Sequence, residues 1–129
     1  MLNDTLANAL SAILNAEKIG KKECIIKPSS KIIEKILSIM NDEGYIGKVE
    51  KKPSIGGEEV KVNLIGKINK CGAIKPHYAV SLDQMEKFEK RFLLAKDFGI
   101  LILSTSQGIM TNEEAIKKKI GGRLLAYCY

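Results

Sequence analysis

The sequence predicts an α+β protein, because segments with a helical spacing of apolar residues are interspersed with short segments of strand-like pattern. The chain has 129 residues, of which 45% are hydrophobic, so it can bury a core as one domain or as two small lobes. Only 5% of the residues are aromatic and none is Trp. We therefore expect a core made of Ile, Leu and Val.

The first expected element is a helix over residues 4–19, in which apolar side chains recur at helical spacing. The opposite side carries a narrow stripe of short polar side chains, and the first of these, Asp4, is a suitable N-cap. Amide and hydroxyl groups can form hydrogen bonds with sugar and phosphate oxygens, although an ordinary solvent-exposed face has the same pattern. The stripe consists of Asp4, Asn8, Ser11 and Asn15.

Residues 23–26 predict a short strand, and a second helix follows Ser29, Ser30 and Lys31. Either serine can cap this helix, and Gly44 ends it. The free N–H groups and partial positive charge of a helix N-terminus favour an anion. Lys31 opposes the helix dipole at that point, and a bound phosphate would offset the cost. Without a phosphate, the two serines are simple caps.

Two further strands are expected over residues 45–49 and 60–65. Between them, Lys51-Lys52-Pro53 and Gly56-Gly57 supply turn chemistry. The glycines are not followed by Gly-Lys-Ser/Thr, which argues against a nucleotide-binding loop.

A basic stretch over residues 67–76 is the expected boundary between two lobes, at residues 1–70 and 71–129. In the second half we expect a strand opening at residues 77–80 and a charged helix over residues 81–96. This helix has a mixed-sign face that is typical of solvent exposure.

A buried strand over residues 100–103 leads into the most informative segment of the chain, Ser104-Thr105-Ser106-Gln107-Gly108. Hydroxyl and amide groups can donate and accept hydrogen bonds, so they can contact a base edge, a ribose hydroxyl or a phosphate. Gly108 permits a sharp turn or a close approach of the backbone. On this pattern alone, the segment is an RNA contact, an anion pocket of an enzyme, or a simple tight turn.

The rest of the chain predicts a short helix and a final strand. Thr111 and Glu114 have the spacing of a capping box for a helix through residues 116–119. Gly121-Gly122 then lead into a strand over residues 123–129.

The charge of the chain favours a polyanionic partner. Lys and Arg number 21 against 15 Asp and Glu, which gives a net charge of +6 and a pI near 9.2. Cations that neutralise phosphates release counterions, so such a surplus promotes binding to nucleic acid.

No apolar run approaches the roughly 20 residues that span a bilayer. The N-terminus does not have the pattern of a signal peptide, so we expect a cytoplasmic protein.

No catalytic or metal-binding set is evident in the sequence, and we expect no enzyme activity and no cofactor. His77 is the only histidine, and no nucleophile motif lies near it. The three cysteines, Cys24, Cys71 and Cys128, lack the spacing of a zinc site. We expect them to be reduced thiols, mostly buried.

Several of these motifs together resemble the small-subunit ribosomal protein eight family. They are Pro28-Ser29-Ser30-Lys31, Gly44-Tyr45-Ile46, Ser104-Thr105-Ser106-x-Gly108-x-Met110-Thr111, and Gly121-Gly122 before a terminal strand. The resemblance runs the whole length of the chain. The segment Val62-Asn63-Leu64-x-Gly66-Lys67-x-Asn69-Lys70-Cys71-Gly72 looks like the archaeal and eukaryotic branch of the family.

The resemblance implies two small lobes, a first with helix-strand-helix-strand-strand order and a second that is mainly an antiparallel β sheet with short helices. It also implies a structural component of the small ribosomal subunit. Members bind a helix with an internal loop in the central domain of small-subunit rRNA and promote its folding and subunit assembly. Neighbouring small-subunit ribosomal proteins are further implied partners, and some relatives bind their own messenger RNA.

The resemblance carries RNA-binding roles to matching positions in both lobes. In the second lobe, the turn would make the specific contacts in or near a minor groove, with Arg123 suited to phosphate. In the first lobe, the opening helix and the start of the second helix would hold the backbone nearby. The implied RNA-binding residues are Asp4, Thr5, Asn8, Asn15, Ser29, Ser30, Lys31, Thr105, Ser106, Gln107, Gly108 and Arg123.

Two functions from other classes remain open at this point. One is an enzyme that uses the Ser104–Gly108 turn as a small-anion pocket. The other is a protein-protein adaptor that uses the helix over residues 84–96, which would bind in a manner insensitive to salt.

Overall fold

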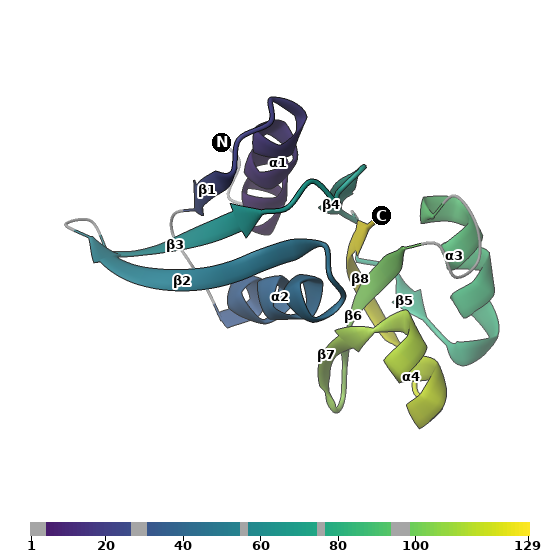
Figure 1. The fold of residues 1–129 in the computed structure, drawn as a ribbon. Helices are drawn as coiled ribbons and strands as arrows, with labels where there is room; N and C mark the ends of the chain where they lie inside the picture. The colour runs from purple at the N-terminus through teal and green to yellow at the C-terminus, as the bar shows by residue number, and fades with distance from the viewer. Residues whose placement is uncertain (1–4, 27–30, 55–56, 75–76, 94–98) are drawn as a thin grey trace. The chain divides into compact units, whose positions relative to one another are not determined.

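The computed structural model describes residues 5–26, 31–54, 57–74, 77–93 and 99–129. The chain divides into two compact units, Met1–Lys70 and Cys71–Tyr129, and each contains helices and an antiparallel sheet (Figure 1). The predicted α+β class is confirmed.

Unit 1 has the predicted helix-strand-helix-strand-strand order. Its three strands form an antiparallel sheet in the order β1-β3-β2. Its elements are α1 (Thr5–Lys18), β1 (Glu23–Ile26), α2 (Lys31–Asp42), β2 (Ile46–Ser54) and β3 (Gly57–Leu64).

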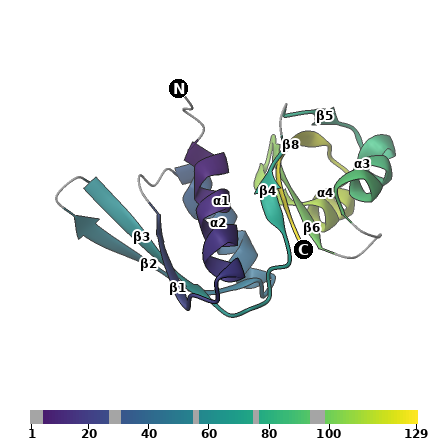
Figure 2. The same ribbon diagram turned by 90° about the horizontal axis from the view of Figure 1, so that it is seen from above.

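Both helices of unit 1 cover the same face of its sheet (Figure 2). Leu10 and Ile13 from α1, Ile36 from α2 and Val60 and Val62 from β3 are buried in this layer. The apolar spacing that predicted the helices therefore selects the sides that face the sheet. The opposite face of the sheet carries charged and polar side chains and also the exposed Ile25.

The end of α2 is set by Gly44, as predicted. Gly44 has φ +83°, a conformation that favours glycine. Its N–H donates to Asn41 O at 3.0 Å, and Tyr45 N–H donates to Met40 O at 2.9 Å. These bonds satisfy carbonyls in the last turn of the helix.

The prediction of a turn at Lys51-Lys52-Pro53 is wrong, because these residues continue β2. Lys51 lies opposite Val60, and Pro53 lies opposite Glu58. A proline has no N–H to give to a ladder, but β2 is an edge strand, where proline is tolerated. The two residues that join β2 to β3 lie outside the described residues.

Unit 2 is built on a sheet in the order β4-β8-β6-β7, and β5 also pairs with β8. All pairings are antiparallel. The unit contains β4 (Cys71–Ala73), β5 (Ala79–Val80), the 3-10 helix η1 (Leu82–Gln84), α3 (Met85–Phe92), β6 (Ile100–Thr105), β7 (Gly108–Thr111), α4 (Asn112–Lys118) and β8 (Gly122–Cys128).

The helix predicted over residues 81–96 is shorter than expected. It opens with η1, and α3 ends at Phe92. Leu93 is extended, with φ −106° and ψ 154°, and is 3% exposed. Burial of Leu93 in the core favours this conformation over another helical turn. The remaining residues of the predicted segment, 94–96, lie outside the described residues.

Buried hydrogen bonds connect α3, α4 and β6 in unit 2. Asn112 Nδ2 donates to Glu89 Oε1 at 2.9 Å, and Leu101 N–H donates to Asn112 Oδ1 at 3.2 Å. Glu89 and Asn112 are 4% and 5% exposed. One amide side chain therefore satisfies two buried polar groups at the centre of the unit.

Asn112→Ala is expected to lower the free energy of unfolding by roughly 2–4 kcal/mol, because the Leu101 N–H and the Glu89 carboxyl group would lose their shared buried partner. Urea denaturation followed by circular dichroism measures the loss. Glu113→Ala, at the adjacent exposed position, is the control and should cost no more than about 1 kcal/mol. Equal losses for the two variants would contradict the role of Asn112.

Candidate nucleic-acid interface

The polar segment predicted to contact RNA forms the turn of the β6–β7 hairpin. Thr105 lies opposite Gly108, and Ser106 and Gln107 form the two-residue connection. Ser106, Gln107 and Gly108 are exposed, and Thr105 is half-buried. The structure therefore brings together four of the predicted site residues at one surface position.

The Thr105 hydroxyl holds the turn from inside. Thr105 Oγ1 donates to Gly108 O at 2.7 Å and accepts from Gln107 N–H at 3.1 Å. Its single proton is thus used within the turn. The side chains of Ser106 and Gln107 are exposed, while Thr105 holds the backbone that carries them.

Glycine is required at Gly108 for its backbone conformation. Gly108 has φ +113°, although a Cβ there would meet no atom within 4 Å. The requirement comes from the backbone conformation and not from packing, because residues that have a Cβ rarely adopt this positive φ.

The Gly121-Gly122 pair is explained by close approach of β8 to the neighbouring strands. A Cβ at Gly122 would lie 2.5 Å from Ser104 O and 2.9 Å from Thr105 Cγ2. A Cβ at Gly121 would lie 2.3 Å from Val80 O. The start of β8 therefore lies directly against Ser104 and Thr105, where β6 leads into the turn, and only glycine fits there.

Arg123 is exposed and lies opposite Ser104 in the β6–β8 ladder. Cross-strand partners have their side chains on the same face of a sheet. This register places a guanidinium group next to the residue that precedes Thr105. The predicted contact of Arg123 with phosphate stays a prediction.

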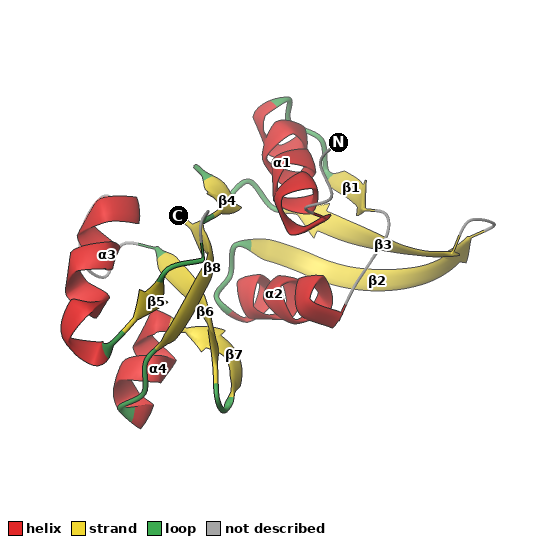
Figure 3. Ribbon diagram, turned by 180° about the vertical axis from the view of Figure 1, so that it is seen from behind, coloured by secondary structure: helices red, strands yellow, loops and turns green. Residues whose placement is uncertain are grey.

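The C-terminal part of α4 adds three exposed lysines that the sequence analysis did not select, Lys117, Lys118 and Lys119. Lys119 has φ +57° and ends the helix. The end of α4 and the β6–β7 turn extend to the same side of unit 2 (Figures 1 and 3). The run of three lysines before Gly121-Gly122 was the signal that could have found them.

The first predicted site residues in unit 1 lie on α1. Asn8, Ser11 and Asn15 are exposed, which fits a polar stripe at helical spacing. Asn15 also borders a hollow of about 460 Å³ between α1 and β1, together with Lys21 and Ile25. Thr5 is the first residue of α1, and Asp4 lies outside the described residues.

The second predicted site in unit 1 is only partly described. Lys31 is exposed and begins α2. Ser29 and Ser30 lie outside the described residues. The proposed anion site at this helix start therefore stays a prediction.

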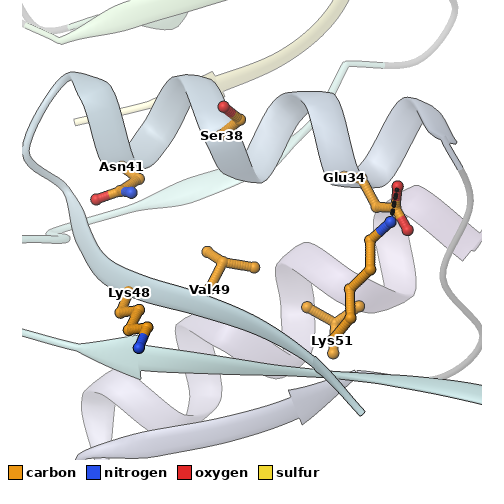
Figure 4. A pocket seen from close by; sticks show the side chains of 7 residues that line it. Glu34, Ser38, Asn41, Lys48, Val49 and Lys51 are labelled. Carbon is orange, nitrogen blue, oxygen red and sulfur yellow. Dashed lines mark ion pairs between the residues drawn. The ribbon is translucent and has the colours of Figure 1, made fainter. Parts of the chain in front are cut away.

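A second hollow in unit 1, of about 300 Å³, lies between α2 and β2 (Figure 4). Lys51 Nζ is 3.1 Å from Glu34 Oε2 at its edge. The Asn41 amide, oriented so that its NH2 meets acceptors, donates to Ile46 O at 3.2 Å and Gly47 O at 3.3 Å. These polar groups serve the contact of α2 with β2.

Several lysines outside the predicted site form ion pairs with glutamates. Lys61 Nζ lies 3.0 Å from Glu23 Oε1, across the outer face of the unit 1 sheet. The hydrogen bond that Lys61 donates to Glu23, together with the negative charge of Glu23, raises the pKa of Lys61. Lys90 Nζ lies 3.6 Å from Glu86 Oε1 on α3. These cations have acidic neighbours that compete with a polyanion.

His77 and the cysteines show no catalytic arrangement among the described residues. His77 Nδ1 lies 2.9 Å from Leu124 O, so the Nδ1-protonated tautomer donates to that carbonyl. Cys24, Cys71 and Cys128 are thiols, of which the last two are buried. No group of three or more potential metal ligands occurs in the described part of the chain. Among its helices, none is long and apolar enough to cross a membrane.

The described residues present an exposed polar turn with Arg123 near it, a surface whose hydrogen-bonding groups and charge suit a polyanionic partner. The sequence profile of ribosomal protein S8 matches residues 4–129. The chain therefore belongs to the ribosomal protein S8 family, and it is a ribosomal protein of the small subunit, located in the cytoplasmic ribosome. This family consists of structural ribosomal proteins and not of enzymes, which disfavours the small-anion enzyme. Assignment to the archaeal and eukaryotic branch stays a prediction.

Gly122→Ala is expected to cost roughly 1–3 kcal/mol and to displace the turn, because its Cβ would collide with the backbone of Ser104. Amide chemical shifts of residues 104–108 report the displacement. Gly47→Ala is the matched control, since a Cβ there would meet side-chain atoms no nearer than 3.3 Å. Unchanged shifts at the turn in Gly122→Ala would show that β8 does not support it.

Proposed function

We propose that this protein binds directly to a helix with an internal loop in the central domain of small-subunit rRNA and promotes the folding of that RNA and subunit assembly. The observation that carries the proposal is the turn held by Thr105, which presents Ser106 and Gln107 to solvent. Membership of the S8 family supports a small-subunit rRNA as the partner.

The polar and basic side chains of unit 2 suit recognition of RNA shape. The A-form major groove is too deep and narrow for side chains, whereas the wide minor groove exposes ribose hydroxyls and base edges. A turn with short neutral donors and acceptors can enter such a groove. Arg123 and the three lysines at the end of α4 would then contact phosphates on either side.

Unit 1 would add a second set of contacts to the same RNA. Asn8 and Asn15 offer amide groups from α1, and Lys31 offers a cation at the start of α2. Together with Asp4, Thr5, Ser29 and Ser30, these residues would hold the sugar-phosphate backbone. Contacts of this type fix the register of a protein on RNA but do not read its sequence.

Two partners beyond the rRNA follow from the same proposal. Neighbouring small-subunit ribosomal proteins would contact the surfaces that RNA leaves uncovered. Its own messenger RNA is a second RNA target if it contains a similar looped helix. The adaptor interpretation of α3 makes a different prediction, namely partner binding that survives high salt and ribonuclease.

Ser106→Ala and Gln107→Ala are expected to weaken binding to a looped rRNA fragment by roughly 1–3 kcal/mol, because each loses hydrogen bonds to the irregular part of the helix. Thr105→Val should lose as much by loosening the turn, whereas Thr105→Ser, which retains the hydroxyl, should bind normally. Filter binding at fixed salt, with a fully paired duplex as competitor, measures the effect.

Ser38→Ala on the exposed face of α2 is the control and should bind like the unaltered chain. The loss in the turn variants should be confined to the looped fragment. If the same variants lose equal affinity for the paired duplex, the turn does not select RNA shape. If the unaltered chain shows no preference for the looped fragment, the proposed function is wrong.

Lys31→Ala is expected to reduce the slope of log K against log salt by about one unit, because one phosphate contact is lost. The triple change Lys117→Ala, Lys118→Ala and Lys119→Ala should reduce it by roughly two units. Lys90→Ala, whose side chain lies near Glu86, should leave the slope unchanged. If neither Lys31→Ala nor the triple variant alters the slope, Lys31 and the three lysines at the end of α4 do not belong to the interface.

A further inference from the structure

Two cysteines lie directly opposite each other at the open edge of the unit 2 sheet. Cys71 is the first residue of β4 and pairs with Cys128, the last residue of β8. Gly72 then pairs with Tyr127, and Ala73 with Ala126. The two residues come from opposite ends of unit 2 in the sequence.

The hydrogen bonds of this ladder identify the type of pair. Ile74 N–H donates to Leu125 O at 2.9 Å, one step beyond the pair of Ala73 and Ala126. Hydrogen-bonded and non-hydrogen-bonded pairs alternate along an antiparallel ladder, which makes Cys71 and Cys128 a non-hydrogen-bonded pair. In such a pair the Cα atoms are about 4.5 Å apart and the side chains approach most closely. Disulfides require Cα separations of about 4.4–6.8 Å.

The orientation of the neighbouring residues agrees with this geometry. A Cβ at Gly72 would lie 3.2 Å from Tyr127 Oη, so the Tyr127 ring covers Gly72 on one face of the sheet. Because side chains alternate along a strand, Cys71 and Cys128 lie together on the other face. Both are buried, at 4% and 1% exposure, and both are thiols.

We propose that Cys71 and Cys128 form a reversible cross-strand disulfide in the presence of a small disulfide oxidant such as oxidised glutathione. One protein thiolate attacks a sulfur of the oxidant, and one glutathione thiolate leaves. The second protein thiolate then attacks the protein sulfur of this mixed disulfide and displaces the other glutathione. The two cysteines are oxidised to one disulfide, the oxidant is reduced to two thiols, and the two cysteine protons end on these products.

The location of the pair gives the oxidant a route to buried sulfur atoms. β4 has three residues and lies at the edge of the sheet. Cys128 is the last residue of its strand. Edge strands and strand ends open most readily, so brief fraying of β4 from the end of β8 exposes the first thiol to attack.

The bond would convert nearly all of unit 2 into a covalent ring. It would join the first residue of unit 2, Cys71, to Cys128, close to the unit's end at Tyr129. Closing a long loop removes much of the conformational freedom of the unfolded chain. The β6–β7 turn lies at the other end of β8, opposite Arg123, so the bond would leave the candidate interface in place.

The test uses the full chain, equilibrated with oxidised glutathione and then quenched with an alkylating agent. Peptide mapping should find one linkage, between Cys71 and Cys128, in the unaltered chain and in Cys24→Ala. Cys24 is the internal control, because it lies in β1 of unit 1 and not in the ladder that pairs Cys71 with Cys128. Burial also raises the pKa of its thiol, although the nearby charge of Lys21 lowers it. It should remain a thiol under conditions that oxidise the pair.

Oxidation should also raise the melting temperature of the unaltered chain and of Cys24→Ala by about 10 °C or more, and reduction should reverse the shift. Cys128→Ala should show neither the linkage nor the shift. Because that variant can fail to fold, the Cβ chemical shifts of Cys71 and Cys128 in the unaltered chain provide a second readout of oxidation. A mixed disulfide with glutathione that does not resolve, a dimer linked through either cysteine, or a lower melting temperature would overturn the proposal.

Discussion

β8 pairs with β4, β5 and β6, and Gly122 at its start lies directly against Ser104 and Thr105, where β6 leads into the turn. Contact at Gly122 is made between two backbones, since a Cβ there would lie 2.5 Å from Ser104 O. Backbone contacts of this kind leave little freedom to either strand. The turn is therefore supported by β8, which lies beside its first residues, and by the hydroxyl of Thr105 within it, and the positions of Ser106 and Gln107 follow from these two supports. The buried link from Asn112 to Glu89 and Leu101 fixes α4 and α3 against the same sheet.

Such support has a direct consequence for the proposed recognition of RNA. A turn that is already ordered loses little conformational entropy when it binds, so more of each contact contributes to affinity. Short neutral groups also require close and correctly oriented partners, because they have no long-range attraction to compensate for poor geometry. The lysines at the end of α4 and Lys31 act over longer distances and attract any polyanion. Under the proposal, selectivity and attraction are therefore carried by different side chains.

The parts of the fold that could be predicted are those fixed by local pattern. The apolar spacing of α1 and α2 and the stop at Gly44 depend on nearby residues, so the sequence reveals them. The course of Lys51 to Pro53 depends on pairing with β3, and the end of α3 depends on burial of Leu93. β4 could not be recognised, because three residues become a strand only through β8. The same limit applies to the candidate site: the exposed hydroxyl turn was predictable, whereas its packing on Gly122 depends on strands far apart in sequence.

The two ends of β8 contact different parts of unit 2. Its first residues support the turn, and its last residue lies opposite Cys71. For a strand of seven residues these ends are separated by roughly 20 Å. A covalent bond at the second end would act mainly on the unfolded chain, because the native pairing of β4 with β8 already brings the two sulfur-bearing residues together. The stability of unit 2 could therefore respond to the redox state while the surface proposed to contact RNA keeps its shape. Separation along a single strand is sufficient for this independence, since neither end needs to move when the other changes.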